Sequence, residues 1–191
     1  MAERDLPAGV PADFGQAVES LRAAWLRPQV HLSEVPAPQR IAPHALALSG
    51  EVLDGEDELA SGRFVLLHDP AGQAAWQGTL RAVTFVRAEL EPELATDPML
   101  DEVAWTWLVD ALTAQGADYR ELGGTVTRVL SDSHGTLSDC PPSGELEVRA
   151  SWTPTGLELG THLQGWAALL GTVAGLPPVP DGVLPLRRSI G

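Results

Sequence analysis

The sequence predicts a single α+β domain, in which an antiparallel sheet of about five strands carries its helices on one face. Several segments alternate apolar and polar residues as strands do, and others repeat apolar residues at the spacing of a helix. The turns between the strand candidates are short, which favours antiparallel hairpins. A chain of 191 residues is also long enough to bury a sizeable core in one domain.

The N-terminal part of the chain predicts a helix before the sheet begins. Residues 1–11 are expected to form a flexible arm. Asp13 is expected to cap the helix that follows, and Pro28 is expected to end it. The apolar face of this helix consists of Phe14, Val18, Leu21 and Trp25.

The strands of the first half come after this helix. They are expected at 30–32, as a short edge strand, and at 45–53, 63–68 and 79–91. The acidic run 54–58 and the sequence Asp69-Pro70-Ala71-Gly72 supply the turns between them. In the last of these strands, alternate residues form an apolar side that consists of Leu80, Ala82, Thr84, Val86, Ala88 and Leu90.

The second half predicts two further helices and two further strands. Asp97 and Pro98 begin a helix that Gly116 ends, and the last helix is expected at 159–173. Strands at 122–131 and 145–153 flank a polar loop at 131–144. The domain is expected to span residues 12–175, with a proline-rich surface tail at 176–191. The expected order is one helix, three or four strands, one helix, two strands and one helix. It resembles that of the type III secretion chaperone-like fold, which is helix, three strands, helix, two strands and helix.

The composition excludes several kinds of chemistry. The 26 acidic and 12 basic residues give a net charge of −14, which disfavours nucleic acids and anionic membranes as partners. Every basic residue is an arginine, so no lysine can form a Schiff base or serve a phosphate-binding loop. There is one cysteine and no zinc-binding histidine spacing, so we expect neither metal nor cofactor. No secretory leader and no membrane-spanning stretch is recognisable, which predicts a cytoplasmic protein.

Charged and apolar side chains share the side of the predicted sheet that faces away from the helices. The candidates on this side are Arg81, Phe85, Arg87, Glu89 and Arg149. An aromatic residue is unusual on a purely solvated face, so one interpretation is a platform for a ligand or a protein. The alternative is a lattice of surface salt bridges that contribute about 0–1 kcal/mol each.

The helix after Pro98 has a wider apolar surface than contact with one sheet requires. Trp105, Val109 and Leu112 lie on this surface and are candidates for contact with a second copy of the chain or with another protein. The alternative is contact with other segments of the same chain.

The candidates for chemistry are His68, Asp69 and His134. His68 and Asp69 end an apolar strand, where a general base could lie, but His68 could equally pack on the sheet while Asp69 caps the turn. His134 shares a polar loop with Asp132, Asp139 and Cys140, which would form a site only if they converged. Otherwise this loop simply faces solvent.

Four strings in the chain carry a resemblance to a known family. They are RFVLLHDPAGQ at 63–73, TFVRAELEPE at 84–93, GTVTRV at 124–129 and RASWTP at 149–154. The sequence resembles the actinobacterial proteins known as domain-of-unknown-function family 3000, from about the first helix to the tail. The resemblance implies a bacterial, cytoplasmic, single-domain protein and transfers no activity, cofactor or site residue.

The function expected from these observations is that of a non-catalytic protein-interaction or chaperone-like module that forms a homodimer. The alternative is a small-molecule-binding protein or an enzyme, with its site between the charged sheet face and the loop 131–144. A concave pocket that contains His68 or His134 would favour the alternative. A flat apolar patch around Trp105 would favour the interaction module.

Overall fold

The computed structural model describes residues 9–178 and confirms the predicted fold class. The strands are β1 (Val30–Val35), β2 (His44–Asp54), β3 (Asp57–Gln73), β4 (Gly78–Leu90), β5 (Tyr119–Ser131) and β6 (Ser143–Pro154). The helices are α1 (Ala12–Ala23), α2 (Pro92–Ala95), α3 (Leu100–Ala114) and α4 (Leu159–Val173), with a 3-10 turn, η1 (Gly135–Leu137), between β5 and β6.

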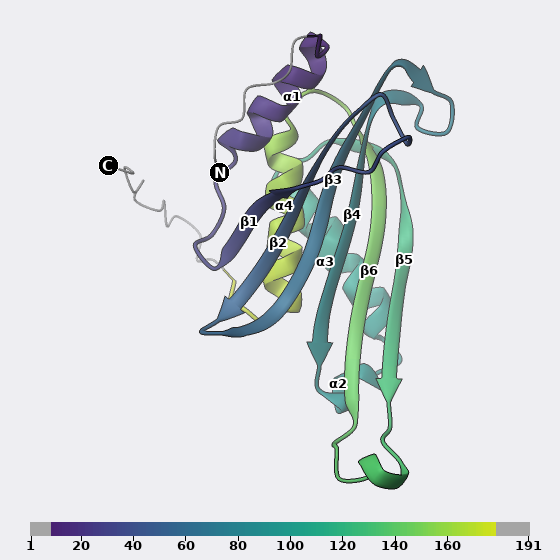
Figure 1. The fold of residues 1–191 in the computed structure, drawn as a ribbon. Coiled ribbons are helices and arrows are strands. Elements are labelled where there is room, and N and C mark those ends of the chain that lie inside the picture. The colour runs from purple at the N-terminus through teal and green to yellow at the C-terminus, as the bar shows by residue number, and fades with distance from the viewer. Residues whose placement is uncertain (1–8, 179–191) are drawn as a thin grey trace.

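The strands form one six-stranded antiparallel sheet in the order β1-β2-β3-β4-β6-β5. Figure 1 shows the long helices α1, α3 and α4 on one side of this sheet, and α4 contacts both α1 and α3. Within residues 9–178, no helix covers the opposite side of the sheet. The two faces therefore differ, since one is packed against helices and the other carries none. A small cluster on this second face, which we call the open face, is nevertheless buried and consists of Ala47, Val65, Leu67 and Trp76.

Alternation of side chains along the strands produces these two faces. On β4, the predicted apolar side is buried from Leu80 to Ala88, as the sequence indicates. β3 has 17 residues and is much longer than the predicted strand 63–68. Its ends are polar and do not alternate clearly in the sequence. Pairing with β2 extends the strand at one end back to Asp57, and pairing of Gln73 with Gly78 of β4 extends it at the other.

Two details of the first helix differ from the prediction. Asp13 lies within the first turn of α1, and no side chain caps the helix, which begins after Pro11. Trp25 was wrongly placed on its apolar face, because α1 ends at Ala23 and the Trp25 side chain is 44% exposed. The chain leaves the helix before Trp25 as it turns toward β1.

The later helices agree better with the prediction. α4 has the predicted bounds, whereas the four-residue α2 was not predicted because it is too short to show a periodic pattern. Asp97 acts at the start of α3, where its Oδ1 accepts a hydrogen bond from the Met99 backbone N–H at 2.8 Å. The predicted start was nevertheless wrong, because Asp97 and Pro98 lie before the helix, which begins at Leu100 after Met99 and has no side-chain cap.

Trp166 on α4 supports the centre of the sheet from the helix side. Its ring lies against Gly50 and Gly62, which face each other on β2 and β3 and leave space for an indole that a side chain would fill. Its Nε1–H donates a hydrogen bond to the backbone oxygen of Phe85 at 3.3 Å. This contact holds Phe85 in place on β4, and the Phe85 side chain points to the opposite face of the sheet.

The predicted domain limits can be compared with residues 9–178 only. Most of the predicted arm at 1–11 and most of the tail at 176–191 lie outside the described residues. The order of elements is one helix, four strands, two helices, two strands and one helix, so it has one strand and one short helix more than the type III secretion chaperone-like order. None of the helices in the described part is both long and apolar enough to cross a membrane.

Candidate functional site

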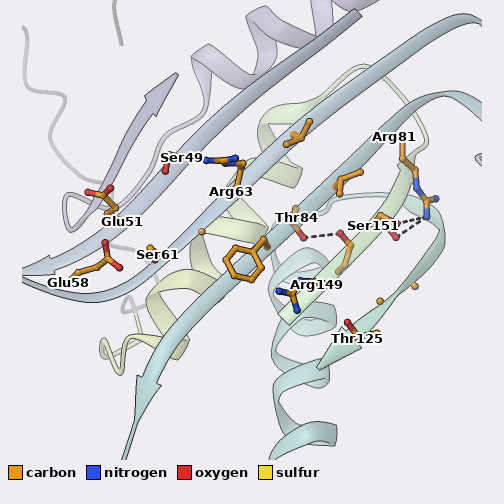
Figure 2. A pocket seen from close by; sticks show the side chains of 17 residues that line it. Ser49, Glu51, Glu58, Ser61, Arg63, Arg81, Thr84, Thr125, Arg149 and Ser151 are labelled. Carbon is orange, nitrogen blue, oxygen red and sulfur yellow. Dashed lines mark hydrogen bonds between the residues drawn. The ribbon is translucent and has the colours of Figure 1, made fainter. Parts of the chain in front are cut away.

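A groove with a volume of about 980 Å³ crosses the open face of the sheet (Figure 2). Side chains of β2, β3, β4, β6 and β5 line it, and every lining residue comes from a strand. The register of the strands therefore decides which side chains meet in the groove.

Antiparallel pairing aligns these side chains in rows that run across the strands. The central row contains Ser49, Arg63, Phe85, Arg149 and Thr125. The row on one side of it contains Ala47, Val65, Val83, Ser151 and Gly123. The row on the other side contains Glu51, Ser61, Arg87, Glu147 and Thr127. The groove thus contains the whole row with two arginines, most of the largely apolar row, and only Glu51 and Ser61 of the charged row.

Phe85 and Arg149 form the centre of the floor. The guanidinium carbon of Arg149 lies 5.0 Å from the centre of the Phe85 ring, a cation–π distance. Arg149 also forms an ion pair with Glu147. Its position is therefore fixed by two contacts, and its charge is partly balanced.

Arg81 is held at one end of the groove by oxygen atoms that carry no charge. Its Nη1 donates to Thr153 Oγ1 at 3.1 Å and to the Glu121 backbone oxygen at 3.0 Å. Its Nη2 donates to Ser151 Oγ at 2.7 Å and to the Ser151 backbone oxygen at 3.2 Å. Burial lowers the pKa of Arg81, and the charge of Glu121 opposes that shift. The arginine is thus fixed in position without a carboxylate in direct contact.

Arg63 lies in the middle of the groove with its side chain exposed. Among residues 9–178 it has neither an ion pair nor a hydrogen-bond partner. The carboxylates of the groove, Glu51 and Glu58, lie at the end opposite Arg81, where β2 turns into β3 (Figure 2). The charges are therefore separated along the groove.

The structure brings together part of the predicted platform. Arg81, Phe85 and Arg149 line the groove, whereas Arg87 and Glu89 lie on the same face outside it. Arg87 forms an ion pair with Glu145 at 2.5 Å, and this contact raises the pKa of Arg87.

Arg63 was missed from the sequence. The strand candidate 63–68 is apolar on both sides after its first residue. Such a pattern predicts a strand that is buried on both faces, so it does not indicate that Arg63 lies on an exposed face. The alternation with buried Phe64 could have placed Arg63 on the same side as Val65.

The chemistry candidates lie away from the groove. His68 is 2% exposed on the helix side, where its ring stacks on Phe14 with centroids 5.7 Å apart. Its Nδ1 has no hydrogen-bond partner, and burial, followed by the charge of His44, lowers the pKa of His68. Asp69 caps the turn, because Oδ1 accepts from the Ala71 backbone N–H at 3.0 Å. This is the structural role considered for Asp69.

His134 and Cys140 are exposed in the loop between β5 and β6, outside the groove. No three His, Cys, Asp or Glu side chains of residues 9–178 come close enough together to hold a metal ion. Neither histidine proposed for chemistry therefore lines the concave surface.

The three candidates on α3 have different surroundings. Leu112 is fully buried in the core, against Gly165 of α4, and is not at the surface where a partner would contact it. Trp105 is half-buried and lies under β5, against Gly124. Val109 is half-buried. Trp105 thus has a contact within the same chain, which was the alternative interpretation for it.

Comparison with known proteins gives a family and no activity. No curated protein and no solved structure shows significant similarity to the chain. One family model, described as a protein of unknown function (DUF3000), matches residues 10–184. The match covers the whole of the sheet and the helices, including every residue of the groove. The chain therefore belongs to the DUF3000 family.

Proposed function

We propose that the protein is a non-catalytic, chaperone-like interaction module that holds an extended segment of a partner protein on the open face of its sheet. The observation that carries this proposal is the groove of about 980 Å³, in which Val65, Val83 and Phe85 lie beside arginines on a face without covering helices. Apolar area flanked by fixed charges on an open face is typical of surfaces that bind other proteins.

The lining residues support binding more than catalysis. Serine, threonine, arginine and glutamate provide the polar groups, and no histidine or cysteine of residues 9–178 lines the groove. Ser151 Oγ accepts a hydrogen bond from Arg81, so its closest charged neighbour is a cation instead of the base that an active nucleophile requires. The two histidines with lowered pKa values, His68 and His162, are buried on the helix side.

The shape supports a protein segment more than a small molecule. Small-molecule sites usually enclose about 70–90% of the ligand surface, whereas an open sheet face covers a ligand from one side. The loop 131–144, which the alternative function requires as the second wall, contributes no residue to the groove. An extended segment can gain enough contact from one side because it lies along several strands.

We also propose that two copies associate through β5. This edge strand has 13 residues and no proline, and no strand of residues 9–178 pairs with its outer side. Val129 and Leu130 on it are 42% and 50% exposed. Long unprotected edges favour pairing with a second strand. Sedimentation velocity should show a dimer that Leu130→Lys converts to a monomer with an unchanged circular dichroism spectrum, and a monomeric parent would refute this contact.

We further propose that the protein acts in the cytoplasm of an actinobacterium. The absence of lysine and the scarcity of isoleucine in the sequence support a GC-rich coding sequence. The free, exposed Cys140 is compatible with a reducing compartment. Fractionation of the native host, followed by immunoblotting, tests the location.

A matched pair of valines tests the binding face. Val83 in the groove is 37% exposed and Val103 on α3 is 38% exposed, so Val83→Asp and Val103→Asp place the same charge at similar exposure on opposite sides of the molecule. Peptides selected from a random phage-displayed library on the purified protein should bind the parent and Val103→Asp, but not Val83→Asp. The proposal fails if no peptide is selected or if the two variants behave alike.

A further inference from the structure

The charge in the groove is opposite to the charge of the whole protein. Its lining contains three arginines and two glutamates, so its local balance is positive, while the chain carries a net charge of −14. The two glutamates lie together at one end. The remaining length of the groove therefore presents cations that the groove itself does not neutralise.

Two of these arginines have no carboxylate in contact. The hydrogen bonds of Arg81 use both of its Nη groups and leave its Nε–H as the remaining donor, whereas Arg63 keeps all of its donors for an anion. Arg63 has no partner among the described residues, and the four oxygen atoms that hold Arg81 are all uncharged. Arg149, in contrast, is paired with Glu147. An arginine that is oriented by neutral hydrogen-bond acceptors keeps its full charge and loses little side-chain entropy when a carboxylate binds.

The register fixes the separation of these two arginines. Arg63 on β3 is opposite Phe85 on β4, and Arg81 lies four residues before Phe85 on the same face. Four residues of extended chain span about 13 Å. Val83, opposite Val65, occupies the position midway between the two rows. A cation, an apolar pair and a second cation thus follow one another along β3 and β4.

We propose that the partner segment is acidic, and that it binds in an extended conformation along β3 and β4 with two carboxylates at positions i and i+4 and an apolar side chain at i+2. The carboxylates pair with Arg63 and Arg81, and the apolar side chain packs on the exposed Val83, beside the buried Val65. Alternate side chains of an extended segment point to the same side, so these three positions face the sheet together. This inference rests on the proposed function and specifies its ligand.

A long polyanion fits the same groove poorly. Glu51 and Glu58 would lie against any anion that extended beyond Arg63 toward the β2–β3 turn. The charged row next to it includes Glu147, which already pairs with Arg149. A segment with two carboxylates separated by an apolar residue uses the two arginines that have no carboxylate in contact, and it avoids the acidic end.

The peptides selected in the phage experiment test this inference through their sequences. The expected result is enrichment of Asp or Glu at two positions four residues apart, with an apolar residue midway. For a synthetic peptide made from the enriched sequence, changing either acid to its amide should weaken binding about tenfold, because a charge-assisted hydrogen bond is lost. Fluorescence anisotropy with the unaltered protein measures this, so the result does not depend on the folding of a variant.

Substitutions in the protein provide the matching control. Arg63→Gln should weaken binding of the acidic peptide about tenfold. It should leave almost unchanged the binding of the peptide in which the acid that pairs with Arg63 is replaced by its amide. Arg40→Gln, which changes an exposed arginine outside the groove, should have no effect. Selected peptides that are lost with Val83→Asp but carry no acidic pattern would overturn this inference and leave the proposed function intact. Failure to select any peptide would overturn both.

Discussion

The contact between Trp105 and Gly124 fixes α3 beneath β5. Gly124 faces the helices, and a side chain there would overlap the Trp105 ring and the backbone of β6 at Arg149 and Ala150. Gly123, the preceding residue, faces the open side and has nothing within 4 Å of the position of a Cβ atom. Two adjacent glycines therefore have different roles, and only one of them is required for packing.

This difference leads to a prediction about two alanine variants. Gly124→Ala should destabilise the protein by about 1–3 kcal/mol, because overpacking displaces either Trp105 or β6. Gly123→Ala should be neutral or stabilising by less than about 1 kcal/mol, because it restricts the unfolded chain without a clash. Urea unfolding measures both. Equal effects of the two substitutions would show that Gly124 is not packed against β6 and Trp105.

His162 makes a buried hydrogen bond that requires its neutral form. Nε1–H of Trp152 donates to His162 Nδ1 at 3.0 Å, and both side chains are almost completely buried. Burial lowers the pKa of His162 to about 4, although the charge of Asp118 opposes the shift. A proton on Nδ1 would replace the acceptor with a donor and break the bond.

The second prediction follows from this lowered pKa. Because the folded state binds a proton at His162 less readily than the unfolded state, stability is complete above pH 6.5 and falls as the pH decreases toward 4. Between pH 7.5 and 5, the free energy of unfolding should decrease by about 2 kcal/mol from this group. Urea titrations at several pH values measure the loss.

A matched pair of histidines isolates the effect of His162. His162→Gln cannot titrate and should reduce the pH dependence, although it lowers the stability at neutral pH as well. His31→Gln, at an exposed position on β1, should leave the pH dependence unchanged. A pH dependence that survived His162→Gln would assign the effect to another group, such as His68.

At the level of elements, the sequence predicted the helices and strands in which a long pattern places the apolar residues on one side. β4 alternates over more than ten residues and its predicted apolar side is the buried side, while α4 has the predicted bounds. α2 has only four residues, which are too few to show a helical period. Trp25 follows the end of α1, and the sequence there is too short to show where the helix ends. Local pattern determines an element, while tertiary contacts determine where it ends.

The third prediction concerns α3. Trp105→Glu should destabilise the monomer by about 2–4 kcal/mol, because a charge would replace an aromatic ring in contact with the sheet. Val103→Glu, on the exposed side of the same helix, should change stability by less than about 0.5 kcal/mol. Thermal unfolding distinguishes them. If Trp105→Glu instead dissociated a dimer without changing the stability of the monomer, α3 would be the contact between copies and the β5 contact would be refuted.

At the level of the whole molecule, the groove could be predicted only in part, because it depends on the register between strands. The alternation of β4 and β6 placed Arg81, Phe85 and Arg149 on one face. Which β3 residue is opposite Phe85 depends on the length of the β3–β4 turn and the irregularity between His68 and Gln73. The alignment of Arg63 with Phe85, and hence the site, therefore required the folded sheet.

The last prediction concerns nucleic acids, for which the whole molecule and its groove give opposite expectations. Arginines near an aromatic residue can bind single strands by ion pairing and stacking. The net charge of −14 repels a polyanion, and the groove provides only Arg63 and Arg81 as cations without a carboxylate in contact. Release of counterions from so few phosphate contacts gives little affinity at physiological salt. We therefore expect no binding of single-stranded RNA or DNA at protein concentrations up to about 100 µM, as measured by fluorescence anisotropy.

The salt dependence of binding tests this expectation. Lowering the salt concentration should lengthen the range of the repulsion as well as that of the attraction, so the affinity for a nucleic acid should remain low. An acidic peptide with two carboxylates should bind more tightly under the same change, because it contacts the groove and little of the acidic surface. Micromolar binding of RNA that Arg63→Gln abolished would contradict this expectation. It would mean that the attraction of a few arginines for the phosphates is stronger than the repulsion from the net negative charge of the whole protein.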